Sequence, residues 1–453
     1  MEEAGKMATT DKSPSSELPE PSVGDSLSPI TSKTAGIDLN NSKDVSTCSD
    51  LNSSSDHSDY ESFEYDLGQL SNLPPEIVHC ILGYLDARFV LTRLSLVCKT
   101  FYHLLKDTTT WRLRVVKLSE KSYPVFPEDE DLDWPLACIQ REEFHNLWTN
   151  TETVEHFTLT EAHYAAVDCV HLTEGGRYCY SGSRDRSIQM WDLAKLDAEN
   201  REESINASKV ASAIAHKGWI WHISSNGNKL CSSSWDCYLK IWDINTELTE
   251  LHKLKGPSAF LCSVFLDDLI IAGSYDKRIY AYDPRDSCRS VTKWFLHRGP
   301  VLCLAADDKY MISGSEDQSL KVFDRRADKV LIEHRFKSFP MSLSYGYNQL
   351  WTGHKSGQLK VTYPNDGLFD VVKTYDSGHS GKLTGVVHNL GGLCTCATDK
   401  QIKIHAPTDP IDTLTTLAHH AADVTAVAMQ NNVLASAGGD VSIGIWRPKN
   451  WSV

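Results

Sequence analysis

The amino-acid sequence predicts a mostly β fold: a seven-bladed β-propeller preceded by a small all-α domain and a disordered N-terminal tail. The prediction of a propeller rests on a repeat. The segment SGSRDRSIQMWD at 181–192 returns as SSSWDCYLKIWD at 232–243, and further copies follow at 272–283, 313–324, 352–363, 396–406 and 436–446. The copies recur about every 40 residues, and a period of this length ending in Trp-Asp indicates blades of four strands each.

Two further positions of the repeat carry polar residues. An Asp stands six residues before the Trp position in every copy but the fifth: Asp185, Asp236, Asp276, Asp317, Asp399 and Asp440. We expect each in a tight hairpin turn, where its carboxylate can accept bonds from nearby backbone amides. A His precedes the first strand of five blades: His163, His216, His297, His379 and His420. A catalytic His/Asp set is the alternative, but the repetition favours a structural role.

These copies resemble WD repeats, which cover about two-thirds of the chain. The resemblance implies that each His pairs with the turn Asp in a buried hydrogen-bond network, so that losing one partner would cost about 1–3 kcal/mol. The third blade lacks the His and has Lys255-Gly256-Pro257 there, and the fifth lacks both residues, with Phe336 and Ser356 in their places. We expect these two blades to be held together less well.

Composition limits the classes of partner. The chain has 453 residues, enough for two or three domains, and a formal net charge of −15. Residues 1–70 hold 14 acidic and 4 basic residues. No basic stripe, which nucleic-acid binding needs, stands out. No apolar run is long enough to span a bilayer, and the N-terminus lacks the apolar core of a secretory signal. We therefore expect neither a nucleic-acid nor a membrane partner.

Cysteine usage and motifs limit the chemistry. The 13 Cys, an odd number without paired spacing, indicate reduced thiols and an intracellular protein, in the cytoplasm or the nucleus. Cys394 and Cys396 lack a second pair of ligands, so no zinc site is expected. No nucleophile, metal cluster or Gly-rich phosphate loop stands out. We expect no catalytic residues and no cofactor.

Residues 1–66 form the predicted tail, which is acidic and rich in Ser. With few aromatic residues it cannot bury enough apolar surface to offset the cost of ordering. Ser53 lies three residues before Asp56, and Ser58 lies three before Glu61, a spacing that resembles the targets of acid-directed kinases. A merely solvated acidic tail is the alternative.

The helical domain spans residues 67–114. Asn72 can cap its first helix and Asp86 its second. Apolar residues of the first helix recur at helical spacing: Ile77, Ile81 and Leu85. The stretch LPPEIVHCILGYLDARFVLTRLSLVCKTFYHLLKDTTTWR at 73–112 resembles an F-box. An unrelated helical hairpin with a Leu-Pro start is the alternative.

An F-box binds the adaptor subunit of SCF-type ubiquitin ligases, which ties it to a cullin, so the resemblance implies both partners. It places the adaptor contact on Leu73, Pro74, Ile77, Leu82 and Leu85. Three helices in so short a segment make a small core. Some of their apolar surface should therefore need a partner.

Residues 115–153 are predicted to be a helical linker, with an acidic loop at 127–134 and a helix at 135–150 that acts as a rigid spacer. Residues 154–453 form the propeller. Val154–Leu159 is expected to complete the last blade, because the final repeat leaves that blade one strand short and closure removes an exposed edge. The polar insertion Lys195–Ser208 is expected to be a surface loop.

In WD propellers, ligands usually sit on the face around the channel mouth. Position in the repeat places five candidate substrate-binding residues there: Trp219, Trp235, Phe260, Tyr275 and Arg184. Aromatic residues at an exposed rim are typical of binding hot spots. The alternative is that several of them point into the blades as core. An Arg cluster of the kind that reads a phosphorylated degron is not indicated.

The two resemblances together imply the substrate-recognition subunit of an SCF-type ubiquitin ligase, a non-catalytic receptor. It would bind the adaptor through the F-box and an unknown protein substrate through the propeller face. One alternative is an adaptor-bound WD-repeat scaffold without a degradation role. The other is an enzyme with a site at the channel mouth, built from Glu316, Lys382 and Asp423.

Overall fold

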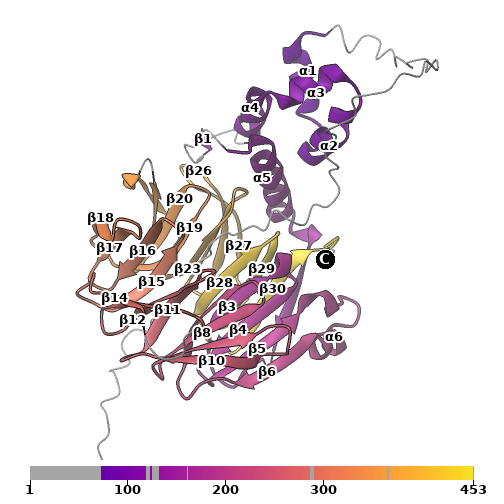
Figure 1. The fold of residues 1–453 in the computed structure, drawn as a ribbon. Helices are drawn as coiled ribbons and strands as arrows, with labels where there is room; N and C mark the ends of the chain where they lie inside the picture. The colour runs from indigo at the N-terminus through magenta and orange to yellow at the C-terminus, as the bar shows by residue number, and fades with distance from the viewer. Residues whose placement is uncertain are drawn as a thin grey trace, which may run out of the picture.

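The structure, a computed structural model, describes residues 73–118, 123–124, 132–160, 162–285, 290–364 and 367–451. A group of helices stands at one side of a ring of β-sheets (Figure 1). The predicted tail at 1–66, with its kinase-like sites, lies outside the described residues, and so does Asn72. Within the described ranges, no helix is long and apolar enough to cross a membrane.

The helical domain consists of α1 (Pro75–Leu82), α2 (Ala87–Thr92), the 3-10 helix η3 (Leu94–Leu96), α3 (Lys99–Lys106) and α4 (Thr108–Leu118). Helix α1 has Pro74, not Asn72, at its N-cap position. Asp86 caps α2 as predicted, because its carboxylate accepts a hydrogen bond of 2.9 Å from the amide of Phe89. The buried side chains form one small core: Leu82, Ala87, Val90, Leu105, Trp111 and Val115.

Seven four-stranded antiparallel sheets form the blades, which confirms the predicted fold class (Figure 1). The first blade consists of β3 (Val167–Thr173), β4 (Tyr178–Ser183), β5 (Ser187–Asp192) and β6 (Lys209–Ile214). The second consists of β7 (Ile220–Asn226), β8 (Lys229–Ser234), β9 (Tyr238–Asp243) and β10 (Thr249–Lys255). The third consists of β11 (Phe260–Phe265), β12 (Ile270–Ser274), β13 (Ile279–Tyr282) and β14 (Thr292–Trp294). The fourth blade consists of β15 (Val301–Ala306), β16 (Tyr310–Ser315), β17 (Ser319–Asp324) and β18 (Lys329–Arg335). The fifth consists of β19 (Pro340–Gly346), β20 (Gln349–His354), β21 (Gln358–Tyr363) and β22 (Asp370–Asp376). The sixth consists of β23 (Leu383–His388), β24 (Leu393–Ala397), β25 (Ile402–Ala406) and β27 (Asp412–Leu417).

The seventh blade closes the ring. It joins β28 (Val424–Gln430), β29 (Val433–Gly438) and β30 (Ile443–Pro448) to the N-terminal strand β2 (Val154–Leu159), which pairs with β30 from Val154↔Pro448 to Leu159↔Ile443. The predicted closing strand is confirmed with its predicted bounds. Its Glu155 accepts a hydrogen bond of 3.1 Å from Arg447 of β30.

Short elements decorate the blades: η4 (Thr151–Thr153), η5 (Glu174–Gly176), η6 (Leu193–Lys195) and a two-stranded sheet of β1 (Tyr123–Pro124) with β26 (Thr408–Asp409). The insertion Lys195–Ser208 is not only a loop as predicted, because it contains the helix α6 (Arg201–Ser208). Glu202 and Glu203 lie in the first turn of α6, where negative charge is favoured by the helix dipole.

The predicted His–Asp pair is present in five blades, with His Nδ1 2.9 to 3.5 Å from the carboxylate: His163–Asp185, His216–Asp236, His297–Asp317, His379–Asp399 and His420–Asp440. In the second blade the network extends further, because Trp242 Nε1 donates to Ser232 Oγ at 2.9 Å, and that hydroxyl meets His216 Nε2 at 2.7 Å. The third blade uses a substitute, in which the hydroxyl of Tyr280 donates to Asp276 at 2.6 Å.

In the second blade the pKa of both partners of the pair is shifted. Burial lowers the pKa of His216, and Asp236 offsets this only in part. Burial alone would raise the pKa of Asp236, but hydrogen bonds from His216 and two backbone amides outweigh it and hold that pKa below its usual range. Burial also lowers the pKa of His354 to about 4 and that of His405 to about 3. These imidazoles are therefore neutral inside the propeller at neutral pH.

We expect the propeller to lose stability as the pH falls from about 6.5 toward about 4. The buried histidines take up a proton in the unfolded chain below their ordinary pKa of 6.5 but stay neutral in the folded chain. Because the unfolded state then binds more protons, the free energy of unfolding falls, by about 1.4 kcal/mol per pH unit for each such His. Urea unfolding at several pH values measures this slope. The fall in unfolding free energy per pH unit should be smaller in the variant His405→Gln. It should be unchanged in the control His252→Gln, because His252 is exposed. A stability that does not change over this range would contradict the prediction.

Helix α5 (Trp134–Thr149) belongs to two cores at once. Its N-terminal half adds Cys138 and Ile139 to the core of the helical domain. Its C-terminal half adds Phe144 and Trp148 to a core shared with the sixth and seventh blades. The predicted linker helix is confirmed, and because one continuous helix is part of both cores, the helical domain and the propeller are held in a fixed relation (Figure 1).

A buried ion pair joins α5 to α4. Arg114 Nη2 donates to Glu142 Oε2 at 2.9 Å, Nε donates to the other carboxylate oxygen, and both side chains are 9% exposed. Arg114 also donates to the carbonyl of Leu82 at 2.6 Å, and Glu142 accepts from the amide of Ala87 at 2.9 Å. Such additional hydrogen bonds are what a buried ion pair needs to offset the loss of hydration.

Two glycines between β23 and β24 leave room for α5. A Cβ on Gly392 would lie 2.1 Å from the Phe144 ring, and a Cβ on Gly391 would lie 2.6 Å from the carbonyl of Gln140. We expect Gly392→Ala to weaken the docking of α5 by about 1–3 kcal/mol, because the buried ring must move. Calorimetry should then resolve separate transitions for the helical domain and the propeller. Gly439→Ala is the control, since its Cβ would meet nothing closer than 3.5 Å. Unfolding of the Gly392 variant as in the wild type would contradict the prediction.

Candidate functional site

A β-bulge recurs at the start of the first strand in every blade. The register shifts by one residue at the same place seven times, between Val167 and Cys169 in the first blade and at the equivalent position in the others. The extra residues form what we call the inner ring: Asp168, Trp221, Leu261, Leu302, Met341, Thr384 and Thr425. A bulge leaves its extra residue out of the ladder and redirects the side chain. Trp221, Leu261 and Leu302 pack together although they come from three blades, so we place the ring around the mouth of the central channel.

The inner ring has an apolar half and a polar half. Blades two to five contribute Trp221, Leu261, Leu302 and Met341, and the other three blades contribute Thr384, Thr425 and Asp168. The polar members bond within the protein: Thr384 donates to the carbonyl of Val424 at 2.6 Å, and Asp168 accepts from Arg184. The apolar members are buried as well: Trp221, Leu261, Leu302 and Met341 are 6%, 4%, 6% and 1% exposed, so they pack within the propeller and support the residues around them.

Four aromatic side chains of blades two and three form a continuous row that includes Trp221 of the inner ring. Ring centroids are 6.2 Å apart for Trp219 and Trp221, 6.1 Å for Trp221 and Trp235, and 5.3 Å for Trp235 and Tyr275. Trp219 and Tyr275 are each 43% exposed. We call these four residues the aromatic row. The structure thus brings together three of the aromatic residues that the repeat pattern predicted for this face.

Arg184, the predicted cation of the face, already has partners within the protein. Its guanidinium lies 4.9 Å from the Trp219 ring centroid and binds Asp168 through Nε at 2.9 Å and Nη2 at 3.1 Å. Burial raises the pKa of Asp168 to about 6, against the opposing effect of Arg184. The charge of Arg184 is therefore largely compensated by Asp168, and its main effect is to hold the edge of the aromatic row.

The prediction for Phe260 is wrong. Phe260 is fully buried and packs on Tyr280 and Tyr282 within the blades. Backbone bonds give the true equivalence: Trp235 N donates to Trp219 O, and Tyr275 N donates to Ala259 O, both at 2.9 Å. Ala259, not Phe260, therefore matches Trp219. A shift of one residue turns a strand side chain to the opposite face.

The helical domain presents a second surface. Ile77 is 47% exposed, and Ile81, one turn further along α1, is 41% exposed. Tyr84 and Leu85, which are 92% and 36% exposed, follow directly after the C-terminus of α1. Pro74 is exposed and Leu73 half-buried. Further exposed apolar residues of this domain are Phe89, Leu96, Val97 and Tyr102. Apolar groups exposed in such number are typical of an interaction site.

Leu82 corrects the predicted contact set. It is 4% exposed and belongs to the core of the helical domain. Five residues separate it from Ile77, which places the two side chains on different sides of a helix. The sequence prediction also missed Ile81 and Tyr84 as surface residues. Their spacing of four and seven residues from Ile77 is the signal that could have found them.

Comparisons with known proteins bear on both surfaces. The F-box-like family model matches residues 70–116, and the WD domain, G-beta repeat model matches residues 154–192, 208–243 and 288–324. The chain is 40% identical over 379 residues to F-box/WD repeat-containing protein 9 of Bos taurus, and the aligned region covers 83% of this chain and 82% of that protein. The chain belongs to the F-box/WD-repeat family. The Homo sapiens protein of the same name gives the same identity and coverage. F-box/WD repeat-containing protein mec-15 of Caenorhabditis elegans is 30% identical over 336 residues, covering 71% of this chain and 80% of that protein.

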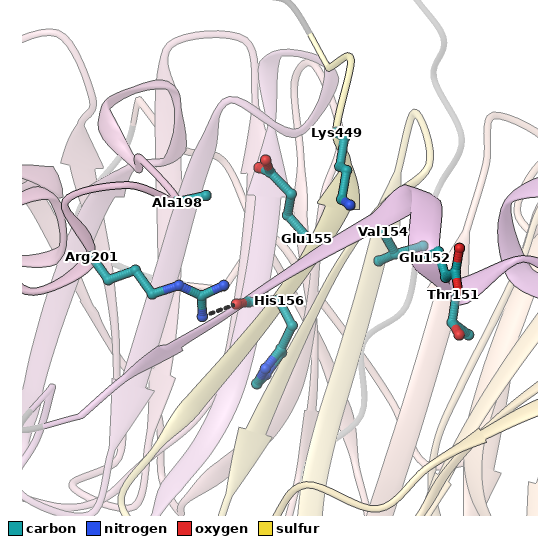
Figure 2. Close-up of a pocket in the computed structure, with 8 residues that line it drawn as sticks. All are labelled: Thr151, Glu152, Val154, Glu155, His156, Ala198, Arg201 and Lys449. Carbon is teal, nitrogen blue, oxygen red and sulfur yellow. Dashed lines mark hydrogen bonds between the residues drawn. The ribbon is translucent and has the colours of Figure 1, made fainter.

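This F-box/WD-repeat protein also has an open hollow of about 680 Å³ beside the closing strand β2. Figure 2 shows Arg201 of α6 turned toward the carbonyl of His156, to which it donates at 3.1 Å, with Glu155 and Lys449 nearby. Groups of both signs line the hollow, so it favours neither an anion nor a cation. Among the residues that the structure describes, no three His, Cys, Asp or Glu are grouped to hold a metal ion.

Proposed function

We propose that this protein is the substrate-recognition subunit of an SCF-type ubiquitin ligase. In this proposal the F-box binds the adaptor, and through it a cullin, and the propeller face binds target proteins. The observation that carries the proposal is the rigid connection: helix α5 shares a core with the F-box at one end and with the propeller at the other. A fixed distance between adaptor and target suits a ligase, because the target must be held near the ubiquitin donor.

The adaptor surface in this proposal is the exposed apolar side of α1 and the segments beside it. It comprises Leu73, Pro74, Ile77, Ile81, Tyr84 and Leu85, whereas Leu82 supports it from within. Burying a few hundred Å² of such surface favours association by several kcal/mol at about 25 cal/mol per Å², before the entropic costs of binding. No bond chemistry is required of this chain. It raises the effective concentration of a target lysine near the charged ubiquitin.

The experiment is affinity capture from cells in which the proteasome is inhibited. It compares the full chain with a chain lacking residues 73–111 and with the variant Ile77→Asp/Tyr84→Asp, which places one charge on the exposed side of α1 and a second just beyond its C-terminus. We expect adaptor and cullin to disappear from both altered chains while other captured proteins remain. Leu251→Asp is the matched control, because Leu251 is 40% exposed on the outer strand of blade two. Equal capture of the adaptor by all chains would refute the proposed contact.

The scaffold alternative predicts the same assembly but a different consequence. The half-lives of the retained proteins, measured without proteasome inhibition, separate the two. A substrate receptor requires that these half-lives lengthen in the Ile77→Asp/Tyr84→Asp variant. Unchanged half-lives, with adaptor binding intact in the wild type, would favour an adaptor-bound scaffold without a degradation role.

A further inference from the structure

The outer side of helix α3 carries basic and aromatic side chains that are exposed to solvent. The later members stand three, four and seven residues after the first, so all project from one face of the helix: Lys99, Tyr102, His103 and Lys106. The opposite side packs inward, where Leu105 is 3% exposed. Immediately before α3, Leu96 and Val97 are 80% and 50% exposed. We call this side of α3, together with Arg93, Leu96 and Val97, the α3 face.

The α3 face is basic when every charge of its segment is counted. Residues 87–106 contain four Lys or Arg and no Asp or Glu. The acids that border this stretch cap the helices beside it, and the segment stays net positive when they are included: Asp86 accepts from the amide of Phe89 at 2.9 Å, and Asp107 accepts from that of Thr109 at 3.0 Å. Arg88 pairs with Glu143. Among the residues that the structure describes, the other three cations have no carboxylate partner: Arg93, Lys99 and Lys106.

The chain itself supplies a segment of opposite charge. Residues 44–72 contain seven Asp or Glu and no Lys or Arg. Residues 1–72 hold only three aromatic residues, and all three stand near the end of that range: Tyr60, Phe63 and Tyr65. The segment 59–70, DYESFEYDLGQL, therefore combines acids with aromatic and Leu side chains. It matches the α3 face both in charge and in apolar character.

The segment is long enough to reach the α3 face. Helices α1 and α3 share one core through Leu82 and Leu105. The outer side of α3 therefore lies within about two helix diameters, about 20–24 Å, of α1. The ten residues that lead from Phe63 to Leu73, just before α1, span up to about 35 Å when extended.

A second acidic stretch, residues 127–133, is less suited to the α3 face. It contains no aromatic residue. The chain before it is fixed to the propeller, because β1 pairs with β26. The chain after it is fixed to α5, whose first turn is capped by Asp133. The N-terminal segment is held at one end only.

We propose that the segment 59–70 of this chain docks on the α3 face. Its carboxylates lie beside the three unpaired cations, and its aromatic rings cover the exposed apolar residues, which in such number are typical of an interaction site. A segment too polar to fold alone can become ordered on a surface of this kind. The contact leaves the exposed side of α1 open to the adaptor and does not depend on the proposed function.

Photo-crosslinking in the full chain, purified without adaptor at low concentration, tests the proposal. A p-benzoylphenylalanine takes the place of Phe63, and the cross-linked peptides are identified after digestion. We expect cross-links to residues 93–106 of the same molecule, with a yield that falls as salt is added. The charge reversal Lys99→Glu/Lys106→Glu should lower the yield about fivefold, because two exposed ion pairs are lost. Lys117→Glu/Lys253→Glu is the matched control, since both lysines are exposed outside the α3 face.

Reversing the charges of both partners separates docking from misfolding. Glu61→Lys/Glu64→Lys should lower the yield as Lys99→Glu/Lys106→Glu does, and the combination of all four changes should restore it, because opposite charges face each other again. A combination that stays as low as the double variants would overturn the proposal. So would cross-links that lead to residues 127–133, to the propeller or to a second copy of the chain. If position 63 gave no cross-link to α3 and bound adaptor alone slowed hydrogen exchange there, the adaptor would be the occupant and the proposal would be wrong. The proposed function is untouched by these results, because capture of the adaptor is measured separately.

Discussion

Replacing Arg114 with methionine is expected to destabilise the F-box helices by about 3–5 kcal/mol. The substitution leaves the carboxylate of Glu142 buried at 9% exposure without its cation. It also removes the donor to the carbonyl of Leu82, at the end of α1. Because α1 carries the proposed adaptor surface, adaptor binding should fall with stability. Denaturant unfolding and a direct binding assay with purified adaptor measure the two effects.

An exposed ion pair between the same two parts of the fold provides the control. Arg88 binds Glu143 at 2.6 Å, with side chains 61% and 30% exposed. Arg88→Met should cost at most about 1 kcal/mol, because solvent screens this pair. The double variant Arg114→Met/Glu142→Leu should recover part of the loss, since no unpaired charge remains buried. If Arg114→Met cost no more than Arg88→Met, the buried pair would not be what joins α4 to α5.

Trp235→Ala is expected to reduce capture of target proteins by about 30-fold, the effect of losing a hot-spot residue of roughly 2 kcal/mol. Trp235 lies in the middle of the aromatic row, in contact with Trp221 and Tyr275. Because it is only partly buried, the free energy of unfolding should fall by less than about 2 kcal/mol. Adaptor binding should not change. Quantitative capture from cells, with unfolding measured on the purified protein, tests this.

Phe260→Ala is the contrasting variant. Phe260 is fully buried in the third blade, so its truncation should cost about 3–5 kcal/mol and reduce capture only through loss of folded protein. Equal destabilisation by Trp235→Ala and Phe260→Ala would mean that Trp235 is a core residue, and the proposed binding face would be misplaced. Intact capture by a stable Trp235→Ala protein would also contradict the prediction.

The repeat, the F-box stretch and the closing strand could be read from the sequence because each depends on local order along the chain. The Trp, Asp and His positions recur at a fixed spacing, and that spacing determines the strands, the turns and the five His–Asp pairs. Val154–Leu159 was predictable as the closing strand because the last repeat ends one strand short. Helix α5 was predictable from its apolar spacing, but its membership of two cores was not.

The sequence by itself determined the architecture of this protein, and the tertiary structure decided which side chains are available to a partner. Phe260 and Leu82 are large apolar residues of the kind found at contact sites, yet both are buried. The direction of a side chain depends on a register that is set by the neighbouring strand or helix. The inner ring, with its apolar half, exists only where the bulges of seven blades converge. The pairing of Arg114 with Glu142 joins two helices whose relative position no local pattern specifies. Such features arise when segments distant in sequence pack together, and for this reason local patterns did not predict them.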